Sequence, residues 1–392
     1  MSDRPLSENM EKIVIVSAVP ETILAFMSKH LQALAREYVT YAICSNAGNI
    51  SLERLIPNVE YIDIHIERKI SPFKDISSLF KLIQFFRLHQ FTLVQSITPK
   101  AGLLSMAAAW ICRVPIRVHI FTGQVWVTRS GFSRWYLKSC DRLIAFLATS
   151  LLADSPSQKE FLITEGIASA RDIQVLGDGS ICGVDALRFK SNQDAKKRVR
   201  TQLEIPEDAT VALFMGRLKR DKGVLDLARA LGILQSEPNK LYVLLVGPDE
   251  EGLVDQILEL ASPKRNQVRF VGPVNNPEDF FAAADFLCLP SYREGFGLVT
   301  IEAAAAGIPA LASRIYGITD AIIDGVTGIL HEPGDFVGIA KGLQEMTVDS
   351  EKRKEMGNVA KNRALELFST SRIVGAQLSY FQSLIQKYRS HA

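Results

Sequence analysis

The sequence is poor in cysteine, and its few cysteines are far apart. The 392 residues include five cysteines, at positions 44, 112, 140, 182 and 288, and no two of them form a Cys-x-x-Cys pair. A disulfide framework or a structural zinc site needs paired or closely spaced cysteines, so neither is expected. A reducing, cytoplasmic compartment fits this cysteine usage best.

Long apolar runs are missing as well. No stretch of about 18 consecutive apolar residues occurs, which is the length that a membrane-spanning helix needs. The N-terminal segment, residues 1–12, is polar and lacks the apolar centre of a signal peptide. The longest apolar patch, residues 103–112, has the length of a buried helix. We therefore expect a protein that does not span a membrane, although it could lie peripherally on the inner face of the cytoplasmic membrane.

The overall charge favours no charged partner. The chain has 45 Lys and Arg against 43 Asp and Glu, a formal net charge of +2, which argues against a nucleic-acid-binding protein. The basic residues are unevenly spread, however. Residues 101–150 carry six Lys and Arg and a single acid, Asp141. Any attraction to an anionic partner would therefore come from this segment and not from the charge of the whole chain.

Two ligand-binding motifs of α/β proteins are absent. No Gly-x-Gly-x-x-Gly follows the first expected strand, residues 12–18, which argues against a dinucleotide oxidoreductase. No Asp-x-Asp occurs, so a metal bridge to a diphosphate has no obvious set of ligands. We accordingly expect neither a bound metal nor a cofactor.

The sequence does contain a regular alternation of short β-branched runs with segments of helical spacing. The runs of the first half precede a charged, polar segment at residues 189–210, and the alternation then restarts at residues 210–216. This pattern predicts parallel sheets covered by helices on both faces. We predict an α/β protein with two Rossmann-like, doubly wound domains, residues 1–190 and 191–365, facing a cleft. A C-terminal helix at 366–392 would cross back toward the first domain. Ligands of such sheets bind beyond the carboxyl ends of the strands.

The segment REGFGLVTIEAAAAGIP, residues 293–309, surrounds a plain apolar helix with glycines and two carboxylates. We predict a helix that begins near Gly297 and is capped by Gly307. The first turn of a helix has unpaired N–H groups and favours a bound anion. Glu294 would lie on the loop before the helix and Glu302 about one turn into it. The two carboxylates could therefore accept hydroxyls from different parts of one ligand.

The segment FMGRLKRDKG, residues 214–223, places basic side chains directly after another strand. Arg217 offers a planar fork for phosphate oxygens, and Lys222 offers a point charge. Taken alone, the segment could equally be a basic surface loop. Combined with the helix that begins near Gly297, it predicts a diphosphate clamp.

These two segments together resemble the retaining glycosyltransferases of family 4, which have the GT-B fold. Glu294 and Glu302 reproduce the E-x7-E spacing of that family, and residues 180–189 resemble its inter-domain segment. The resemblance implies a nucleotide-sugar donor in the C-terminal domain, and family usage favours a UDP-linked one. Arg217 and Lys222 would hold the diphosphate, Glu294 the donor sugar and Glu302 the ribose. The donor-binding set that it implies is Gly216, Gly272, Pro273, Gly295, Phe296, Gly297, Leu298 and Glu302.

The predicted strand at 116–121 ends on the acceptor side of the expected cleft. Many family members have a His-Gly pair at this point, whereas this chain has Thr122 and Gly123, with His119 three positions earlier. Residues 119 and 122 of a straight strand face opposite sides, so they are not interchangeable. Whether Thr122 or His119 does the work of the family histidine stays open, and Gly123 and Gln124 are assigned to the acceptor side. The TGQVW sequence here resembles that of capsule, O-antigen and lipid-linked oligosaccharide transferases.

Two segments, residues 68–91 and 118–138, interleave aromatic side chains with Lys and Arg. Interfacial helices have this composition, and basic clusters favour anionic lipid. Core helices with a solvated basic edge are the alternative for each segment alone. Together, and in this family, they favour a glycan or polyprenyl-diphosphate-linked acceptor at a membrane surface.

The resemblance implies transfer of a hexosyl or N-acetylhexosaminyl group with retention, in the synthesis of a surface polysaccharide or other glycan. Arg217, Lys222 and the helix dipole would stabilise the leaving diphosphate. The candidate catalytic set is Glu294, Arg217, Lys222, Thr122 and His119. The alternative is a GT-B protein that binds nucleotide-sugar without transfer, because the family's glycine pair after the first strand is missing. A sugar-nucleotide epimerase would not predict REGFG followed by Glu302.

Overall fold

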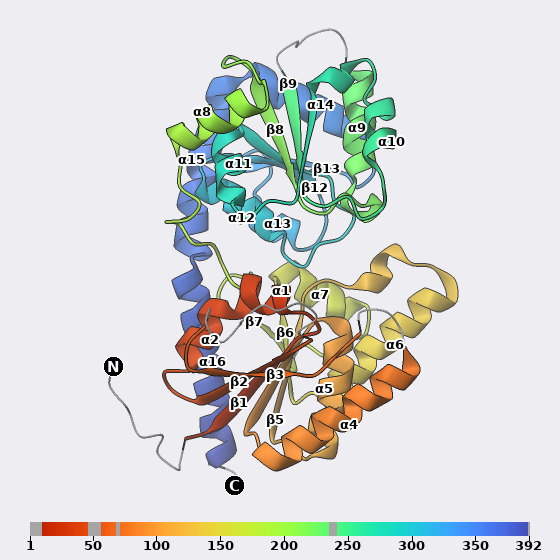
Figure 1. Ribbon diagram of the computed structural model, residues 1–392, viewed down its shortest axis with the longest axis vertical. Coiled ribbons are helices and arrows are strands. Elements are labelled where there is room, and N and C mark those ends of the chain that lie inside the picture. Colours follow the sequence, from red (N-terminus) through yellow and green to blue (C-terminus); the bar gives the residue numbers. More distant parts are fainter. Residues whose placement is uncertain (1–9, 46–55, 68–70, 235–240, 391–392) are drawn as a thin grey trace. The chain divides into compact units, whose positions relative to one another are not determined.

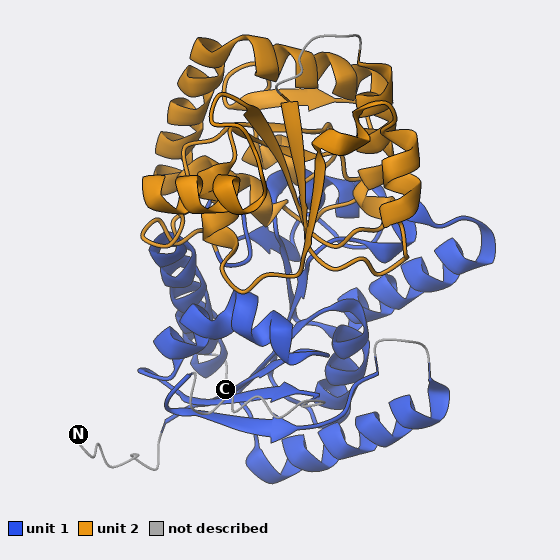
Figure 2. Ribbon diagram, turned by 45° about the horizontal axis from the view of Figure 1, so that its top comes forward, with its two compact units in different colours: residues 1–182, 370–392 blue, residues 183–369 orange. Residues whose placement is uncertain are grey.

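The computed structural model describes residues 10–45, 56–67, 71–234 and 241–390. The chain forms two compact units: unit 1 is Met1–Cys182 with Thr370–Ala392, and unit 2 is Gly183–Ser369 (Figure 2). The division thus falls eight residues before the boundary expected at 190, and the last helix is part of unit 1. Most of the polar N-terminus, residues 1–9, and the start of the segment at 68–91, residues 68–70, lie outside the described residues.

Unit 1 is built on a seven-stranded parallel sheet with the order β3-β2-β1-β4-β5-β6-β7. Every side chain of β4 is buried, as expected when helices cover both faces of a sheet. The strands are β1 Lys12–Val16, β2 Val39–Cys44, β3 Val59–Asp63, β4 Leu93–Ile97, β5 Ile116–Phe121, β6 Ser150–Ala153 and β7 Ile173–Val175.

Helices cover both faces of this sheet (Figure 1). Helix α5 packs between α4 and α6. Helix α16 packs against α2. A buried hydrogen bond from Gln377 Nε2 to Gln95 Oε1, 2.6 Å, joins α16 to β4. The helices are α1 Pro20–Thr22, the π-helix η1 Ile23–Met27, α2 Ser28–Leu34, α4 Pro72–His89, α5 Pro99–Ile111, the 3-10 helix η2 Val125–Thr128, α6 Gly131–Leu147, α7 Pro156–Thr164 and α16 Thr370–Arg389. Across the described ranges, no helix combines the length and the apolar character that crossing a membrane requires.

Unit 2 is built on a six-stranded parallel sheet with the order β10-β9-β8-β11-β12-β13. The strand order reverses between β8 and β11, which are neighbours in the sheet although about seventy residues separate them in the chain. The loops after β8 and β11 therefore meet at a topological switch point, where open α/β sheets bind ligands. The strands are β8 Thr210–Met215, β9 Leu241–Val246, β10 Val268–Gly272, β11 Phe286–Leu289, β12 Ala310–Ser313 and β13 Gly328–His331.

Two apolar cores, one on each face, hold the helices of unit 2 to its sheet. Residues of α8, α11, α12 and α15 form one core, and residues of α9, α10 and α14 dominate the other. The helices are α8 Gln193–Gln202, η3 Arg220–Lys222, α9 Val224–Ile233, α10 Val254–Leu260, η4 Lys264–Gln267, α11 Pro277–Ala283, α12 Leu298–Ala305, α13 Ile318–Ala321, α14 Phe336–Val348 and α15 Ser350–Leu367. The predicted architecture of two helix-covered parallel sheets is confirmed.

The plain composition of α12 follows from its packing. Its alanines are buried in the core that α12 shares with α15. A side chain at Gly357 of α15 would lie 2.2 Å from the carbonyl oxygen of Gly307, so the two backbones approach too closely for a larger residue. Tight packing fixes the axis of α12, and with it the direction of the N-terminus of the helix.

Candidate active site

The helix α12 begins and ends where the sequence predicts. Gly297 precedes it with a φ of +75°, in the left-handed region that favours glycine. Gly307 follows it with a φ of +82°. The N–H of Gly307 donates to Ala304 O at 2.8 Å and that of Ile308 to Ala303 O at 3.1 Å, the pattern of a Schellman cap. The prediction of a glycine-bounded helix is confirmed, and its first turn adjoins Glu294.

The structure joins the two motif segments through Lys222 and Glu294. Lys222 Nζ lies 2.6 Å from Glu294 Oε1, and the side chains are 17% and 16% exposed. The hydroxyl of Ser291 donates to the same oxygen at 2.9 Å. Both bonds use Oε1, so Oε2 is the oxygen of Glu294 that a ligand could reach. Lys222, which is predicted to bind phosphate, and Glu294, which is predicted to bind the donor sugar, are therefore bonded directly to each other.

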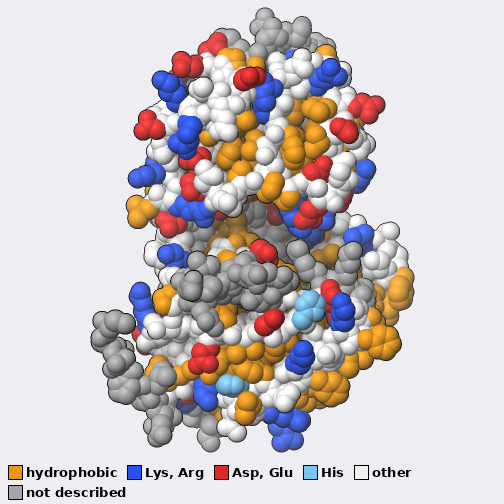
Figure 3. Space-filling model, in the orientation of Figure 1, with side chains coloured by type: hydrophobic (Ala, Val, Ile, Leu, Met, Phe, Trp, Pro, Cys, Tyr) orange, Lys and Arg blue, Asp and Glu red, His pale blue; other side chains and the backbone are white. Residues whose placement is uncertain are grey.

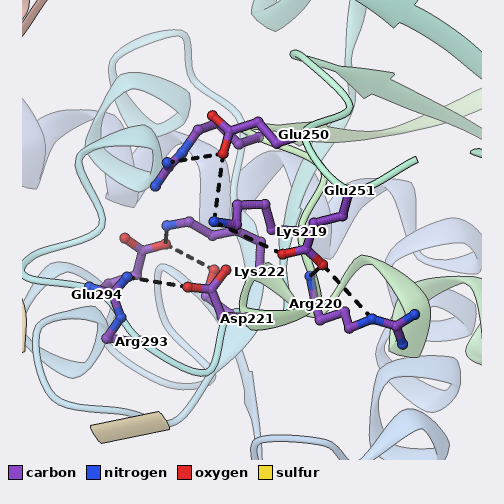
Figure 4. A network of polar contacts seen from close by, with 10 residues as sticks. Lys219, Arg220, Asp221, Lys222, Glu250, Glu251, Arg293 and Glu294 are labelled. Atoms are coloured by element: carbon purple, nitrogen blue, oxygen red, sulfur yellow. Dashed lines mark hydrogen bonds and ion pairs between the residues drawn. The ribbon is translucent and has the colours of Figure 1, made fainter. Parts of the chain in front are cut away.

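Arg217 lies in a second network, formed with the loop after β9. Figure 4 shows Glu250 and Glu251 of this loop beside Lys219 and Arg220. Its guanidinium is 3.4 Å from Glu250 Oε2, and Lys219 Nζ is 3.6 Å from the same oxygen. Arg220 forms an ion pair with Glu251, with Nε 3.8 Å from Oε2. Glu250 and Glu251 were not among the residues predicted from the sequence, although PDEEG directly follows an expected strand end. A bound diphosphate would compete with Glu250 for Arg217.

Glu302 supplies the carboxyl group of the predicted donor set, and its pKa is strongly raised. Loss of hydration on burial raises its pKa to about 7; nearby Glu278 also raises the pKa, and Arg188 lowers it. Among the described residues, none forms a hydrogen bond or ion pair with this carboxylate. Arg188 instead pairs with Glu278, Nε to Oε2 at 3.1 Å. Glu302 therefore has unused acceptor capacity in a partly dehydrated position, which suits paired ligand hydroxyls.

The other residues of the predicted donor set lie at strand ends or behind the loop. Gly216 directly follows β8, and Gly272 and Pro273 follow one another at the end of β10. Phe296 is buried with its ring centroid 5.0 Å from that of Phe368. Only the backbone of Phe296 can therefore face a ligand. The same holds for the preceding Gly295, which has no side chain. Leu298 is the first residue of α12.

In unit 1, His119 belongs to the core. It is 1% exposed, and its Nδ1 lies 2.8 Å from the Ser96 hydroxyl. Burial lowers its pKa to about 3, so the ring is neutral at physiological pH. The Phe121 ring packs edge-on against it, and a side chain at Gly102 would lie 2.5 Å from its Cε1. We interpret His119 as a structural residue, because solvent does not reach it.

Thr122 follows β5 and is partly exposed, so it is the accessible one of the two residues that the sequence left open. Gly123 has a φ of +114° and turns the chain. Gln124 is buried, and its Oε1 accepts a long hydrogen bond of 3.4 Å from Gln158 Nε2. The Gln124 side chain thus holds the loop rather than facing solvent.

Asp154, which directly follows β6, was not among the residues predicted from the sequence. It is 4% exposed, and its Oδ1 has no hydrogen-bond partner in the described part of the chain. Burial raises its pKa to about 8. Its backbone N–H donates to Gln158 Oε1 at 2.7 Å. An acid placed directly after the apolar run SLLA was the available signal.

Part of the aromatic and basic signal at 118–138 is internal packing. Trp126 is buried and donates from Nε1 to Asp141 Oδ2 at 2.7 Å. Arg134 and Lys138 lie over the Trp126 ring at 5.0 and 5.4 Å, and both pair with Glu165. For these three side chains the core alternative holds. Other residues of α4 and α6 project outward, including Phe73 and Phe146, which are 90% and 77% exposed.

Family comparisons cover both units. Residues 27–179 match the family described as "Glycosyl transferase 4-like domain", and residues 195–363 match "Glycosyl transferases group 1". The capsular polysaccharide biosynthesis glycosyltransferase CapM of Staphylococcus aureus is 30% identical over 369 residues, covering 94% of this chain and 96% of CapM. A D-inositol 3-phosphate glycosyltransferase of Corynebacterium kroppenstedtii is 30% identical over 365 residues, covering 86% of this chain and 79% of that protein.

The fold also matches solved structures. HepE of Anabaena, crystallised with UDP and glucose, superposes with a TM-score of 0.77 at 22% identity, over 95% of this chain and 99% of HepE. At this identity the likeness shows the fold alone, which is GT-B. Because CapM matches over nearly its whole length and both units match their family descriptions, the chain belongs to the group 1, family 4-like glycosyltransferases.

Proposed function

We propose that this glycosyltransferase moves a hexosyl or N-acetylhexosaminyl group from a UDP-sugar, with retention, to a lipid-linked glycan in surface polysaccharide synthesis. The observation that carries the proposal is the Lys222–Glu294 pair, which lies at the N-terminus of α12 with the unbonded Glu302 carboxylate one turn farther on. CapM is named for capsular polysaccharide biosynthesis, and HepE was crystallised with UDP and with UDP-glucose. We propose no cofactor, because the nucleotide-sugar itself is the activated substrate.

The chemistry requires stabilisation of a leaving diphosphate. Lys222 would neutralise its charge together with Arg217, once Arg217 exchanges Glu250 for phosphate oxygens. The backbone N–H groups at the start of α12 would add donors directed at the same anion. Glu294 Oε2 would accept a donor-sugar hydroxyl. The acceptor hydroxyl would attack the anomeric carbon on the face that the UDP leaves, and the departing phosphate would take its proton.

We expect UDP to bind and GDP to bind at least about tenfold more weakly, since a site built to hydrogen-bond one base leaves polar groups unpaired with another. Titration calorimetry of the unliganded protein with each nucleotide measures the difference. Thermal shift in the same buffer should show a larger stabilisation by UDP than by GDP at equal concentration. Equal affinity for UDP and GDP would contradict the assignment of the base.

The second candidate is a GT-B protein that binds nucleotide-sugar without transfer. Thr122, in place of the family histidine, is the observation that favours it. A radiolabelled UDP-sugar, incubated with the enzyme and a lipid-linked acceptor, separates the two. Release of UDP together with labelled product excludes the second candidate.

We further propose that helices α4 and α6 rest on an anionic membrane on the cytoplasmic side. Hydrophobic side chains gather on the face of unit 1 where these helices lie (Figure 3). The outward stripe of α6 follows helical spacing at residues 132, 135, 136, 143 and 146. Exposed Lys74, Lys81 and Arg87 of α4 would meet the lipid phosphates. The exposed apolar residues of the two helices are Phe73, Ile76, Phe80, Leu88, Phe132, Trp135, Tyr136, Leu143 and Phe146.

The triple variant Lys74→Glu, Lys81→Glu, Arg87→Glu is expected to bind phosphatidylglycerol vesicles about 100-fold more weakly, because each lost basic residue contributes roughly 1 kcal/mol near an anionic surface. Flotation of the full-length protein on a density gradient measures the bound fraction. A matched control is Lys197→Glu, Lys352→Glu, Lys354→Glu, which makes the same charge change on exposed positions of unit 2. Equal flotation of both triple variants and the wild type would exclude this membrane face.

A further inference from the structure

A second ion pair joins the two donor loops directly beside Lys222 and Glu294. Asp221 Oδ2 lies 3.2 Å from an Arg293 guanidinium nitrogen, and the side chains are 22% and 18% exposed. The backbone N–H of Tyr292 donates to the carbonyl oxygen of Asp221 at 2.9 Å. Residues 221 and 222 of one loop thus pair with residues 293 and 294 of the other. Figure 4 shows the two pairs side by side.

Further contacts hold the same two loops at a fixed separation. The Tyr292 hydroxyl donates at 2.6 Å to Oδ2 of Asp226, in the first turn of α9, which directly follows the loop after β8. Gly223 has a φ of +68°, and a side chain on it would lie 1.9 Å from the Pro290 carbonyl oxygen. Only glycine fits this approach. The loop after β8 and the loop after β11 therefore form one interlocked element.

The Asp221–Arg293 pair is mostly buried but incompletely bonded. Asp221 Oδ1 and Arg293 Nε are buried, and neither has a hydrogen-bond partner among the described residues. Attraction between charges is stronger where water is excluded, so this pair resists sliding of one loop past the other. One acceptor and one donor of the pair stay unbonded. The positions of the two loops are therefore kept although the hydrogen bonding within the pair is incomplete.

We propose that Asp221 and Arg293 are positioning residues for donor transfer: they hold Lys222 and Glu294 in register at the N-terminus of α12. The proposal rests on the function proposed above and adds residues that need not touch the donor. Because the pair has no net charge, it sets geometry without changing the charge that the diphosphate meets. A purely electrostatic role would give the two residues opposite effects on donor binding.

The test is a double-mutant cycle of Asp221→Asn, Arg293→Gln and the combined variant in the full-length enzyme, with kcat, KM for the UDP-sugar and Tm as readouts. Each single variant is expected to lower kcat by about 5- to 30-fold, and the double variant to be no worse than the weaker single, since coupled residues act as one unit. Arg293→Lys should recover part of the loss. Arg220→Gln removes a cation one residue away whose pair with Glu251 is looser, at 3.8 Å, and it should keep kcat within about twofold.

Other outcomes overturn the proposal in distinguishable ways. Opposite shifts of KM in Asp221→Asn and Arg293→Gln would indicate a field effect in place of positioning. A lowered Tm with unchanged kcat would indicate a purely structural pair, and additive losses in the double variant would indicate independent roles. A wild-type protein that binds no UDP in calorimetry would instead contradict the proposed function itself. Wild-type transfer combined with unimpaired variants would remove only the positioning role.

Discussion

Replacement of Glu294 by Ala is expected to lower kcat by about 100-fold or more while the protein stays folded, the loss typical of removing one preorganised group from a reaction centre. The variant would remove the carboxylate that accepts a hydrogen bond from the donor sugar. It would also release the Lys222 ammonium, which lies 2.6 Å from that carboxylate. A freed Lys222 would bind the diphosphate in the ground state as tightly as before or more tightly. We therefore expect the loss in kcat rather than in KM.

Steady-state transfer from the UDP-sugar measures this effect, and thermal unfolding checks the fold. Glu294→Gln keeps the shape and the bond from Ser291 but loses the charge, so it separates charge from packing. Glu251→Gln is the matched control, because Glu251 carries the same group in the neighbouring network without contacting Lys222. A Glu294→Ala variant with kcat within about threefold of wild type would contradict the site assignment.

Replacement of Glu302 by Gln is expected to stabilise the unliganded protein and weaken donor binding at the same time. The folded protein raises the pKa of Glu302 from 4.5 to about 7, so ionisation costs folding free energy. This cost is absent below the unfolded pKa, grows between pH 4.5 and 7, and is fully present above pH 7. At pH 8 the neutral amide should raise the free energy of unfolding by about 1–3 kcal/mol, with the gain vanishing near pH 4.5.

The same variant should bind UDP about tenfold more weakly at pH 8, because an ionised carboxylate accepts hydroxyl hydrogen bonds more strongly than an amide does. For the wild type, UDP affinity should fall as the pH is lowered from 8 to 6 and Glu302 takes up a proton. For Glu302→Gln it should stay flat across that range. Calorimetry at several pH values and denaturant unfolding at pH 8 and pH 5 test both halves. Glu345→Gln, on the exposed face of α14, controls for simple removal of a carboxylate.

A variant that is neither more stable nor weaker in UDP binding at pH 8 would contradict the partial dehydration of an ionised Glu302. Increased stability with unchanged UDP binding would separate the two effects. It would show that Glu302 is a dehydrated acid without a role toward the ribose. The structural reason for expecting both is that the carboxylate has no hydrogen-bonding partner among the described residues, so a ligand is needed to compensate for its lost hydration.

Local pattern was sufficient to predict most of the fold. The β-branched runs at 12–16 and 210–215 are strands, and Gly297 and Gly307 bound a helix as expected. The unit boundary lies at 182 rather than 190, because Val184 and Phe189 pack into the core of unit 2. The charged segment that follows contains α8, whose Ala195 and Val199 pack into the same core. Composition alone does not show this packing, because the apolar stripe of such an amphipathic helix is narrow.

The sequence by itself determined the chemistry that is present: a glycine-bounded helix, two carboxylates eight residues apart, and basic residues after a strand. Glycine conformation, strand alternation and side-chain charge are local properties, so they can be read from neighbouring residues. Only the tertiary structure decided which groups meet. The adjacency of β8 and β11 pairs Lys222 with Glu294 and Asp221 with Arg293 across about seventy residues of chain. The tertiary structure of unit 1 likewise buried His119 against Ser96 and left Thr122 accessible. The alternation along a strand assigns residues to opposite faces, but packing decides which face becomes the core.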